Sequence, residues 1–331
     1  MTAPTASDAL HRGRAALRSG EFGAAREAHQ QALDEQETPE ALHGLAQALY
    51  WLGDYGPALR TFERAYVAMR ARGETRQPAY LAALLAYEHL AVYGNTAISS
   101  GWRQRALRLA GQAGDCPERG WVELWTALLP GDPADRVRRI RAALRIAEAY
   151  DSADLRFPAL ARLGAYDVEQ GRVETGLHQV DEAAAAASSG ELTDPFAIGD
   201  IYCAMLHCCE LTLDVPRAEQ WMAAAEEFAQ RSRFLPISAI CRTHYGGILT
   251  AAGRWAEAED ELATAARIYA EGYRALRPAA LVRLAELRLR QGRLDEAAQL
   301  LAGHERDPDA VRPLARLHLA RGEPEVAATL L

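Results

Sequence analysis

The residues of this chain that could do chemistry as a group are cysteines and histidines in its second half. The group has two parts: Cys203, His207 and Cys208, followed directly by Cys209, form the first, and Cys241 and His244 form the second. Thiolates and imidazoles are the ligands that Zn²⁺ prefers, usually four of them in a tetrahedral set. If the two parts of the group lie on neighbouring helices, packing brings them together, and a metal site is one hypothesis. The ligand types are contributed by Cys203, His207, Cys208, Cys241 and His244.

The spacing within this cluster favours a different interpretation. Zinc motifs usually pair Cys-x2-Cys or His-x3-His on a turn or on one helix face. The spacing along the chain between Cys203 and Cys208 places the two thiols on different faces of a helix. Cysteine is also among the residues most often buried in protein cores. We therefore predict that the cluster packs in the core and binds no metal, with a metal site and a redox pair at Cys208-Cys209 as the less favoured alternatives.

No other pattern in the sequence predicts catalysis. The chain has no GxSxG, GxGxxG, HExxH or DDxxD motif, and it contains no lysine, which rules out a GxxxxGK[ST] phosphate-binding loop. Nucleophilic catalysis would need a serine or cysteine beside a base that a third group orients. The sequence predicts that the protein is not an enzyme, with no catalytic residue and no cofactor.

A recurring turn signal predicts where the helices that would position any site begin and end. A glycine is followed by a polar residue, a large apolar residue, two spacers and alanine, as in Gly53-Asp54-Tyr55 with Ala58. Glycine tolerates the left-handed backbone that ends a helix, and the alanine lets an antiparallel partner approach closely. The signal recurs about every 30 to 43 residues, with Asp214 filling one slot without a glycine. The glycines of the signal are Gly20, Gly53, Gly94, Gly131, Gly171, Gly253, Gly292 and Gly322.

Between these turns, apolar residues recur at the spacing of an amphipathic helix. No segment shows the alternation typical of a strand. We predict an all-α solenoid of about nine antiparallel helix pairs, a right-handed tetratricopeptide-like superhelix that forms one domain over residues 1–331. The longest loop is expected over residues 110–119. The chain ends inside its last pair without a polar cap, and we expect that this end is uncapped or truncated.

The predicted binding surface is the concave side of the stack. In such solenoids the first helix of each pair lines an extended inner groove. Aromatic and arginine side chains in a groove are the usual anchors of binding. The alternatives for these residues are packing between helices for the tryptophans and plain solvent exposure for the polar ones. The groove candidates are Arg14, His43, Gln47, Tyr50, Trp51, Glu88, Trp121, Trp125, Asp167, Thr243 and Glu286.

Charge and composition narrow the class of partner. The formal net charge is -8, whereas nucleic-acid-binding modules are usually basic. The arginine-rich stretch over 136–145 is interpreted as a solvated helix face. We find no signal peptide and no apolar run long enough to span a membrane. The sequence thus predicts a cytoplasmic protein that contacts neither nucleic acid nor membrane directly.

Several segments resemble the repeat region of large actinobacterial LuxR-type transcriptional regulators, over nearly the whole chain. The resemblance is carried by residues 46–55, 241–247, 253–259, 282–288 and 291–297, and by the shorter segments 194–197 and 217–221. In that family the repeats usually precede a DNA-binding helix-turn-helix, and no such module is found here. The resemblance implies a sensor or interaction region of a regulator, and it does not name the signal.

Two functions follow as hypotheses. The first is a binding scaffold of a transcriptional regulator that holds a protein, a peptide or a small-molecule effector in its concave groove. The second is a stand-alone tetratricopeptide accessory scaffold of a biosynthetic or secretion pathway. A homodimer is kept open as the assembly state, because single helix pairs bury little surface alone.

Overall fold

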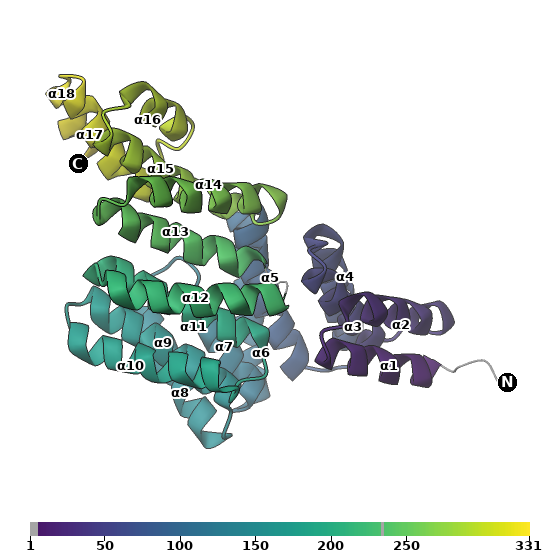
Figure 1. Ribbon diagram of the computed structural model, residues 1–331. Coiled ribbons are helices and arrows are strands. Elements are labelled where there is room, and N and C mark those ends of the chain that lie inside the picture. Colours follow the sequence, from purple (N-terminus) through teal and green to yellow (C-terminus); the bar gives the residue numbers. More distant parts are fainter. Residues whose placement is uncertain (1–5, 233–234) are drawn as a thin grey trace.

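Helices account for all the regular structure in residues 6–232 and 235–331, which are the residues described by the computed structural model. This part of the chain contains 18 α-helices, two short 3₁₀ helices and no strand, which confirms the predicted all-α class (Figure 1). None of these helices is both long and apolar enough to cross a membrane. The first nine helices are α1 (Ala6–Arg18), α2 (Phe22–Glu35), α3 (Pro39–Trp51), α4 (Tyr55–Ala71), α5 (Arg76–Tyr93), α6 (Thr96–Ala113), α7 (Pro117–Ala127), α8 (Pro133–Ala149) and α9 (Ala153–Glu169). The others are α10 (Val173–Ser189), α11 (Pro195–Thr212), α12 (Val215–Ser232), α13 (Leu235–Ala251), α14 (Trp255–Glu271), η1 (Arg274–Leu276), α15 (Arg277–Arg290), α16 (Leu294–Leu301), η2 (Pro308–Ala310), α17 (Val311–Ala320) and α18 (Pro324–Leu330).

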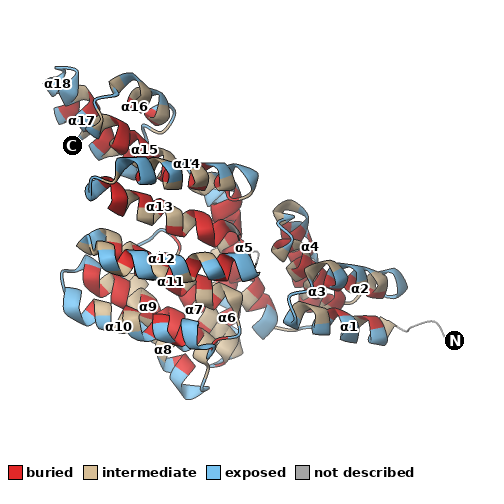
Figure 2. Cartoon of the chain, in the orientation of Figure 1, coloured by how far each residue is buried: buried red, intermediate tan, exposed pale blue. Residues whose placement is uncertain are grey.

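The helices pack as successive antiparallel pairs, α1 with α2 through α17 with α18, as predicted. From α5 to α17 the odd-numbered helices also pack on one another, for instance α9 on α11 and α11 on α13, so they form an inner layer, whereas α3 joins the rest of the stack mainly through α4. Figure 2 shows the result: α5 is largely buried, whereas α10 and α12 expose one face. One continuous apolar core runs from Leu42 to Ala280, with smaller clusters at the two ends of the stack.

The predicted turn signal has the backbone geometry that its glycines imply. Gly53 has φ of 83°, and the N–H of Asp54 donates to the carbonyl of Leu49 at 2.9 Å, which closes the end of α3. Every glycine of the signal except Gly131 has positive φ. At the slot without a glycine, Leu213 takes the left-handed conformation itself, with φ of 54°.

The connection expected over residues 110–119 is much shorter than predicted. Helix α6 continues to Ala113 and α7 begins at Pro117, so that residues 114–116 alone join them. The small residues before Cys116 suggested a loop, but Leu109 and Ala110 are buried against the neighbouring helices and extend α6. Tertiary packing therefore overrides the local loop signal at this position.

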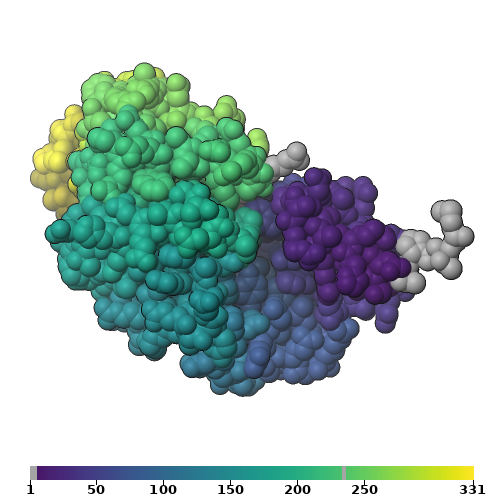
Figure 3. Space-filling model, turned by 60° about the horizontal axis from the view of Figure 1, so that its bottom comes forward, coloured from purple at the N-terminus to yellow at the C-terminus, as the bar shows by residue number. Residues whose placement is uncertain are grey.

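The stack curves until parts far apart in the sequence meet. Helix α5, in the third pair, packs on η1, which follows the seventh pair. The ring of Phe196, at the start of α11, lies 5.0 Å from the ring of Tyr50 on α3. In Figure 3 the purple N-terminal pairs lie against the green surface of later pairs. The superhelix thus closes on itself, and its inner layer encloses a space.

Helices α9 and α10 approach so closely that glycine is required at their crossing. A Cβ atom on Gly164 would lie 2.6 Å from the carbonyl oxygen of Gly176, which is a backbone atom that cannot rotate away. We expect Gly164→Ala to lower the free energy of unfolding by about 1–3 kcal/mol, because the two helices must separate. Urea denaturation followed by circular dichroism measures this change.

The matched control for this substitution is Gly101→Ala in α6. Gly101 is exposed and a Cβ atom there would meet nothing within 4 Å. Alanine should therefore stabilise that helix by roughly 0.5–1 kcal/mol through its better helix propensity. Equal effects of the two substitutions would contradict the close approach of α9 and α10.

Candidate functional site

The space enclosed by the curved stack is a cavity of about 590 Å³. Side chains from α5, α7, α8, α9, α11, α13 and α15 line it, so most of its wall comes from first helices of the pairs. We call it the central cavity. A volume between about 300 and 1,000 Å³ is typical of sites that bind small molecules or short segments. The cavity has an aromatic end and a charged wall.

The aromatic end is formed where the two distant parts of the chain meet. Phe196 lies at its centre, with its ring 5.8 Å from that of Trp125 and 5.0 Å from that of Trp51. Asp194 caps α11 by accepting the N–H of Phe196 at 2.8 Å, which fixes where this ring enters the cavity. Tyr87 and Tyr273 complete the lining at this end.

The N–H group of Trp125 is the polar feature of this end. Trp125 is 94% buried, and its Nε1 has no hydrogen-bond partner among the described residues. A buried donor without an acceptor is costly, so such a group in a cavity wall is suited to donate to a bound acceptor. Trp125 therefore offers a ligand both an aromatic surface and one directional hydrogen bond.

A buried carboxylate joins the two parts of the chain beside the aromatic end. Glu88 on α5 accepts a hydrogen bond from the Tyr50 hydroxyl at 3.0 Å and from the Tyr273 hydroxyl at 2.8 Å, and the two hydroxyls also contact each other. Burial raises the pKa of Glu88 to about 7, although the hydrogen bonds from Tyr273 and Tyr50 act in the opposite direction. We call Glu88, Tyr50 and Tyr273 the closure cluster, because they hold residues from opposite parts of the stack together.

The charged wall begins with an ion pair between α9 and α11. The guanidinium of Arg162 donates to Asp200, with Nε 3.0 Å from Oδ2. Burial opposes the charge of Arg162, but the charge of Asp200 and its hydrogen bond raise the pKa of the guanidinium above its ordinary value. Both side chains line the central cavity.

The wall continues across α11, α13 and α15. Nδ1 of His244 lies 2.7 Å from Oε2 of Glu210, and Arg283 donates to Oε1 of the same carboxylate at 2.8 Å. Burial disfavours ionised Glu210, but the hydrogen bonds from His244 and Arg283 lower its pKa to about 2. Burial lowers the pKa of His244 to about 4, so this imidazole is neutral at neutral pH. His207 lies next to it and contacts Glu169 of α9 at 3.1 Å.

The groove candidates predicted from the sequence fall into different places. Trp125 and Thr243 line the central cavity. Arg14, His43 and Gln47 line a smaller pocket of about 250 Å³ between the first pairs. Their proposed role in binding stays a prediction.

The other candidates are engaged in packing or ion pairs. Tyr50 and Glu88 belong to the closure cluster, and Trp51 contacts Phe196 and Tyr50. Trp121 stacks on Trp125, with ring centroids 6.2 Å apart. Asp167 accepts a hydrogen bond from Arg172, and Glu286 forms ion pairs with Arg316 and Arg290. For these residues a ligand contact also stays a prediction.

Several lining residues were missed by the sequence analysis, above all Phe196, Arg162, Glu210 and Arg283. The sequence held one usable signal for Phe196, because Asp194-Pro195 predicts a capped helix start, and the next residue then faces the inner layer. The charged residues carried no such signal, since arginine and glutamate cover the outer faces of these helices as well.

The cysteine and histidine cluster is only partly assembled by the fold. Cys203, His207 and His244 line the central cavity, and the rings of the two histidines are 5.3 Å apart. Cys241 shares a hydrogen bond with Cys203, which together with burial raises its pKa. Burial also raises the pKa of Cys208 to about 12, and all five cysteines are buried free thiols. The thiols are therefore buried, with Cys203 alone among them in the cavity lining, and the two imidazoles also reach the cavity.

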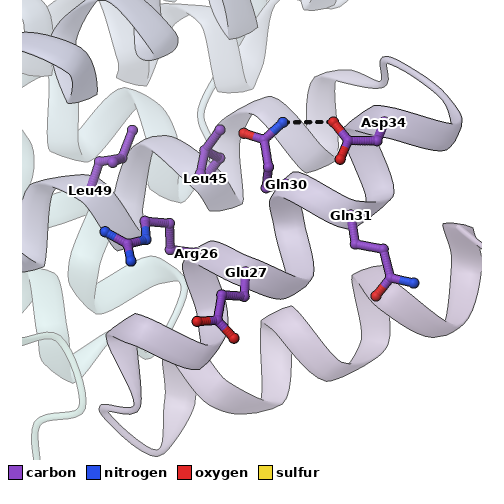
Figure 4. A pocket seen from close by; sticks show the side chains of 7 residues that line it. All are labelled: Arg26, Glu27, Gln30, Gln31, Asp34, Leu45 and Leu49. Atoms are coloured by element: carbon purple, nitrogen blue, oxygen red, sulfur yellow. Dashed lines mark hydrogen bonds between the residues drawn. The ribbon is translucent and has the colours of Figure 1, made fainter.

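A further groove of about 450 Å³ lies between α2 and α3, away from the central cavity. Figure 4 shows Leu45 and Leu49 beside the polar side chains of α2, among which Gln30 donates to Asp34. All its polar side chains come from one exposed helix face. This groove therefore lacks the convergence of several helices that distinguishes the central cavity.

Comparison with known proteins identifies solved structures that have a similar fold. No protein-family model matches the sequence, and no curated protein is significantly similar to it. The structure is similar to that of a Rap protein complexed with Competence and Sporulation Factor, with a TM-score of 0.63, 16% sequence identity and coverage of 98% of this chain and 95% of that chain. A human IFIT1 dimer with m7Gppp-AAAA gives a TM-score of 0.49 at 14% identity, covering 94% of this chain and 77% of that chain. Yeast Tom70 gives a TM-score of 0.34 at 13% identity, covering 98% of this chain and 90% of that chain.

The similarity to the Rap protein spans both chains almost completely. It shows that this chain folds as a tetratricopeptide-like helical solenoid. At 16% identity the similarity concerns the fold alone. What the cavity binds must therefore be argued from its own residues.

Proposed function

We propose that this chain is a binding scaffold that takes a short peptide segment into its central cavity, as the sensor or interaction region of a transcriptional regulator. The observation that carries the proposal is the buried, unpaired N–H of Trp125 in the wall of a 590 Å³ cavity. Peptide carbonyls are acceptors that match this donor. The Rap protein of the same fold is complexed with Competence and Sporulation Factor, which supports the use of such a fold to bind a factor.

The lining of the cavity is consistent with a peptide that is apolar in one part and polar in another. Phe196, Tyr87 and Trp125 offer aromatic surface at one end, and Ile237 and Ile240 add apolar surface. The ion pairs of the charged wall present both signs of charge, which suits the amides and charged ends of a peptide. No charge of a single sign dominates, so a strongly charged partner is disfavoured.

The role in a transcriptional regulator rests on the resemblance of the repeat segments, and an accessory scaffold without a link to DNA is the alternative. Reading the gene beyond the codon for Leu331 separates the two. An in-frame helix-turn-helix supports the regulator, and a stop codon at that point favours the accessory scaffold.

Filling the central cavity should abolish peptide binding. Ala279 lines the cavity and is half-buried, so Ala279→Trp blocks the space without removing a core side chain. Ala263→Trp is the matched control, because Ala263 is exposed on α14. Short peptides are first selected from a phage-displayed library on the wild-type chain, and their affinity for each variant is measured by fluorescence anisotropy. We expect loss of at least about tenfold in affinity for Ala279→Trp and none for Ala263→Trp.

The same peptides test the hydrogen bond from Trp125. Trp125→Phe keeps an aromatic ring but removes the N–H, and it should weaken binding by about 0.5–1.5 kcal/mol, roughly two- to thirteenfold. Trp255→Phe is the control, since Trp255 is 40% exposed on the outer surface. If no peptide can be selected, the proposed binding of peptides is wrong. If the selected peptides bind Ala279→Trp as well as they bind the wild type, the central cavity is not their binding site.

A further inference from the structure

Two imidazoles and a carboxylate meet on the charged wall of the central cavity. His207 and Glu210 lie one helical turn apart on α11, and His244 lies on the neighbouring first helix, α13. One ligand atom from each residue lies within 4.8 Å of the other two. The two histidine rings are inclined at 63° with their centroids 5.3 Å apart, so they meet edge-on instead of stacking.

One of the two imidazoles, His207, is already oriented by a carboxylate outside the proposed ligand set. Nε2 of His207 contacts Oε1 of Glu169 at 3.1 Å, and Nδ1 of His244 contacts Oε2 of Glu210 at 2.7 Å. In metal sites, a carboxylate on one ring nitrogen fixes the ring and directs the other nitrogen to the ion. This applies to His207 and Glu169, whereas the direct contact between Nδ1 of His244 and Oε2 of Glu210 must open for both side chains to bind one ion.

The backbone of α13 leaves room for the carboxylate. A Cβ atom on Gly247 would collide with Oε1 of Glu210 and would lie 3.4 Å from Nε of Arg283. Glycine at this position therefore lets Glu210 reach across from α11 towards His244. A larger residue would push the carboxylate out of the cluster.

The charge of Arg283 is the feature that opposes a cation here. Its guanidinium donates to both oxygens of Glu210, at 2.8 and 2.9 Å. Asp309 lies on the same wall and also interacts favourably with the charge of Arg283. When Glu210 turns to a metal ion, the charge of Asp309 still favours that of Arg283, although the competition of Arg283 for Glu210 lowers the affinity of the site.

The sulfur atoms nearby are not part of the ligand set. Cys203, Cys208 and Cys241 are buried, and among the described residues no sulfur atom belongs to the group of ligand atoms that His207, Glu210 and His244 form. Two imidazole nitrogens and one carboxylate oxygen suit borderline divalent ions such as Zn²⁺, Co²⁺ and Ni²⁺. Three protein ligands would leave one coordination position open towards the cavity.

We propose that His207, Glu210 and His244 bind one divalent transition-metal ion, with Zn²⁺ as the reference ion. This site goes beyond peptide binding and does not depend on it. Ion binding would tie α11 to α13 and would present an open coordination position to whatever enters the cavity. The thiols would contribute nothing to the affinity.

The test uses the full chain without an affinity tag, loaded with Zn²⁺ or Co²⁺ alone. Zn²⁺ is titrated by calorimetry, and the intensity of the visible absorption of Co²⁺ reports tetrahedral nitrogen and oxygen ligands. We expect one ion per chain. His207→Gln and His244→Gln should each weaken binding by about tenfold or more, whereas His178→Gln, at an exposed histidine of α10, should leave binding unchanged. Circular dichroism checks that each variant is folded.

Two further variants separate this site from its alternatives. Arg283→Gln frees Glu210 and should tighten Zn²⁺ binding by a few fold. The double variant Cys203→Ser with Cys241→Ser should bind Zn²⁺ like the wild type. The proposal is overturned if the wild type binds no Zn²⁺, if the two histidine variants bind like the wild type, if Arg283→Gln binds more weakly, or if the serine variant loses the ion.

Discussion

Tyr273→Ala should lower the free energy of unfolding by roughly 3–5 kcal/mol, the loss typical of removing a large buried aromatic side chain. Tyr273 is 2% exposed although it lies in the short segment between α14 and η1. Its ring packs edge-on against that of Tyr55 at 5.0 Å, and its hydroxyl donates to Glu88. The substitution therefore removes contacts between the seventh pair and the second and third pairs in one step.

The consequence for shape should be as large as that for stability. The contacts of Tyr273 and Phe196 bridge distant parts of the curve. Without those of Tyr273, the N-terminal pairs are held by the contacts of Phe196 with Tyr50 and Trp51 and by the sequential packing of α4 on α5. Small-angle X-ray scattering of Tyr273→Ala below its unfolding transition should show a larger radius of gyration. Binding of the selected peptides should weaken in parallel, because Tyr273 also lines the central cavity.

Two variants show which part of the side chain matters. Tyr273→Phe keeps the packing and removes one hydrogen bond to a buried carboxylate, so a loss of about 1–3 kcal/mol is expected. Tyr93→Ala is the exposed control, since Tyr93 is 47% exposed at the end of α5, and it should change stability by less than about 1 kcal/mol. If Tyr273→Ala behaves like Tyr93→Ala, the closed form of the superhelix is wrong.

The local part of this architecture follows from the sequence because its causes are local. A glycine that must adopt positive φ, followed by an apolar residue and an alanine, specifies where one helix ends and its partner begins. Such signals located the nine pairs and placed Cys203 and Cys241 on first helices of consecutive pairs. They failed at residues 110–119, where burial of Leu109 and Ala110 extends a helix through residues that favour turns.

The candidate site was predicted less well because its causes are not local. The closure of the stack depends on the small rotations between successive helix pairs, which add up along the chain. No single residue predicts the total. Glu88 was predicted as a groove residue from its place on a first helix, yet the closure buries it completely against Tyr273, far away in the sequence. The arginines and carboxylates of the charged wall have the same composition as the outer surface, and their convergence is visible in three dimensions alone.

The sequence predicted the position of the cysteine and histidine cluster, but it did not predict the carboxylate that lies beside the histidines. The sequence placed two imidazoles and several thiols on adjacent helices, and packing does bring His207 and His244 together. Glu210 belongs to no sequence motif, and it was not predicted as a ligand. One helical turn separates it from His207, and that turn directs it to the same side of α11.

The stability of the protein should also depend on the protonation of Glu88. In the unfolded chain this carboxyl has a pKa of about 4.5, and burial raises its pKa to about 7 in the folded state. The folded state therefore binds the proton more tightly than the unfolded state. The resulting stabilisation is complete below about pH 4.5 and is lost as the pH rises to about 7 and above, on the order of 3 kcal/mol in total.

Glu88→Gln should remove this dependence, because the amide resembles the protonated carboxyl at every pH. We expect the variant to exceed the wild type in stability by roughly 2–3 kcal/mol more at pH 8 than at pH 5. Urea denaturation of both proteins at the two pH values measures this difference. The surrounding tyrosines stay protonated over this range, since burial raises the pKa of each of them: Tyr50, Tyr55, Tyr80, Tyr87 and Tyr273.

Comparing the two proteins at each pH cancels the titration of other groups. Burial raises the pKa of Asp194 to about 6, which acts in the same direction as Glu88, whereas burial lowers the pKa of His43 to about 4 and acts in the opposite direction. Glu174→Gln is the matched control, because Glu174 is exposed at the start of α10, and its pH profile should run parallel to that of the wild type. A Glu88→Gln profile that also runs parallel would show that the carboxylate is not buried, and the closure cluster would then have to be open in solution.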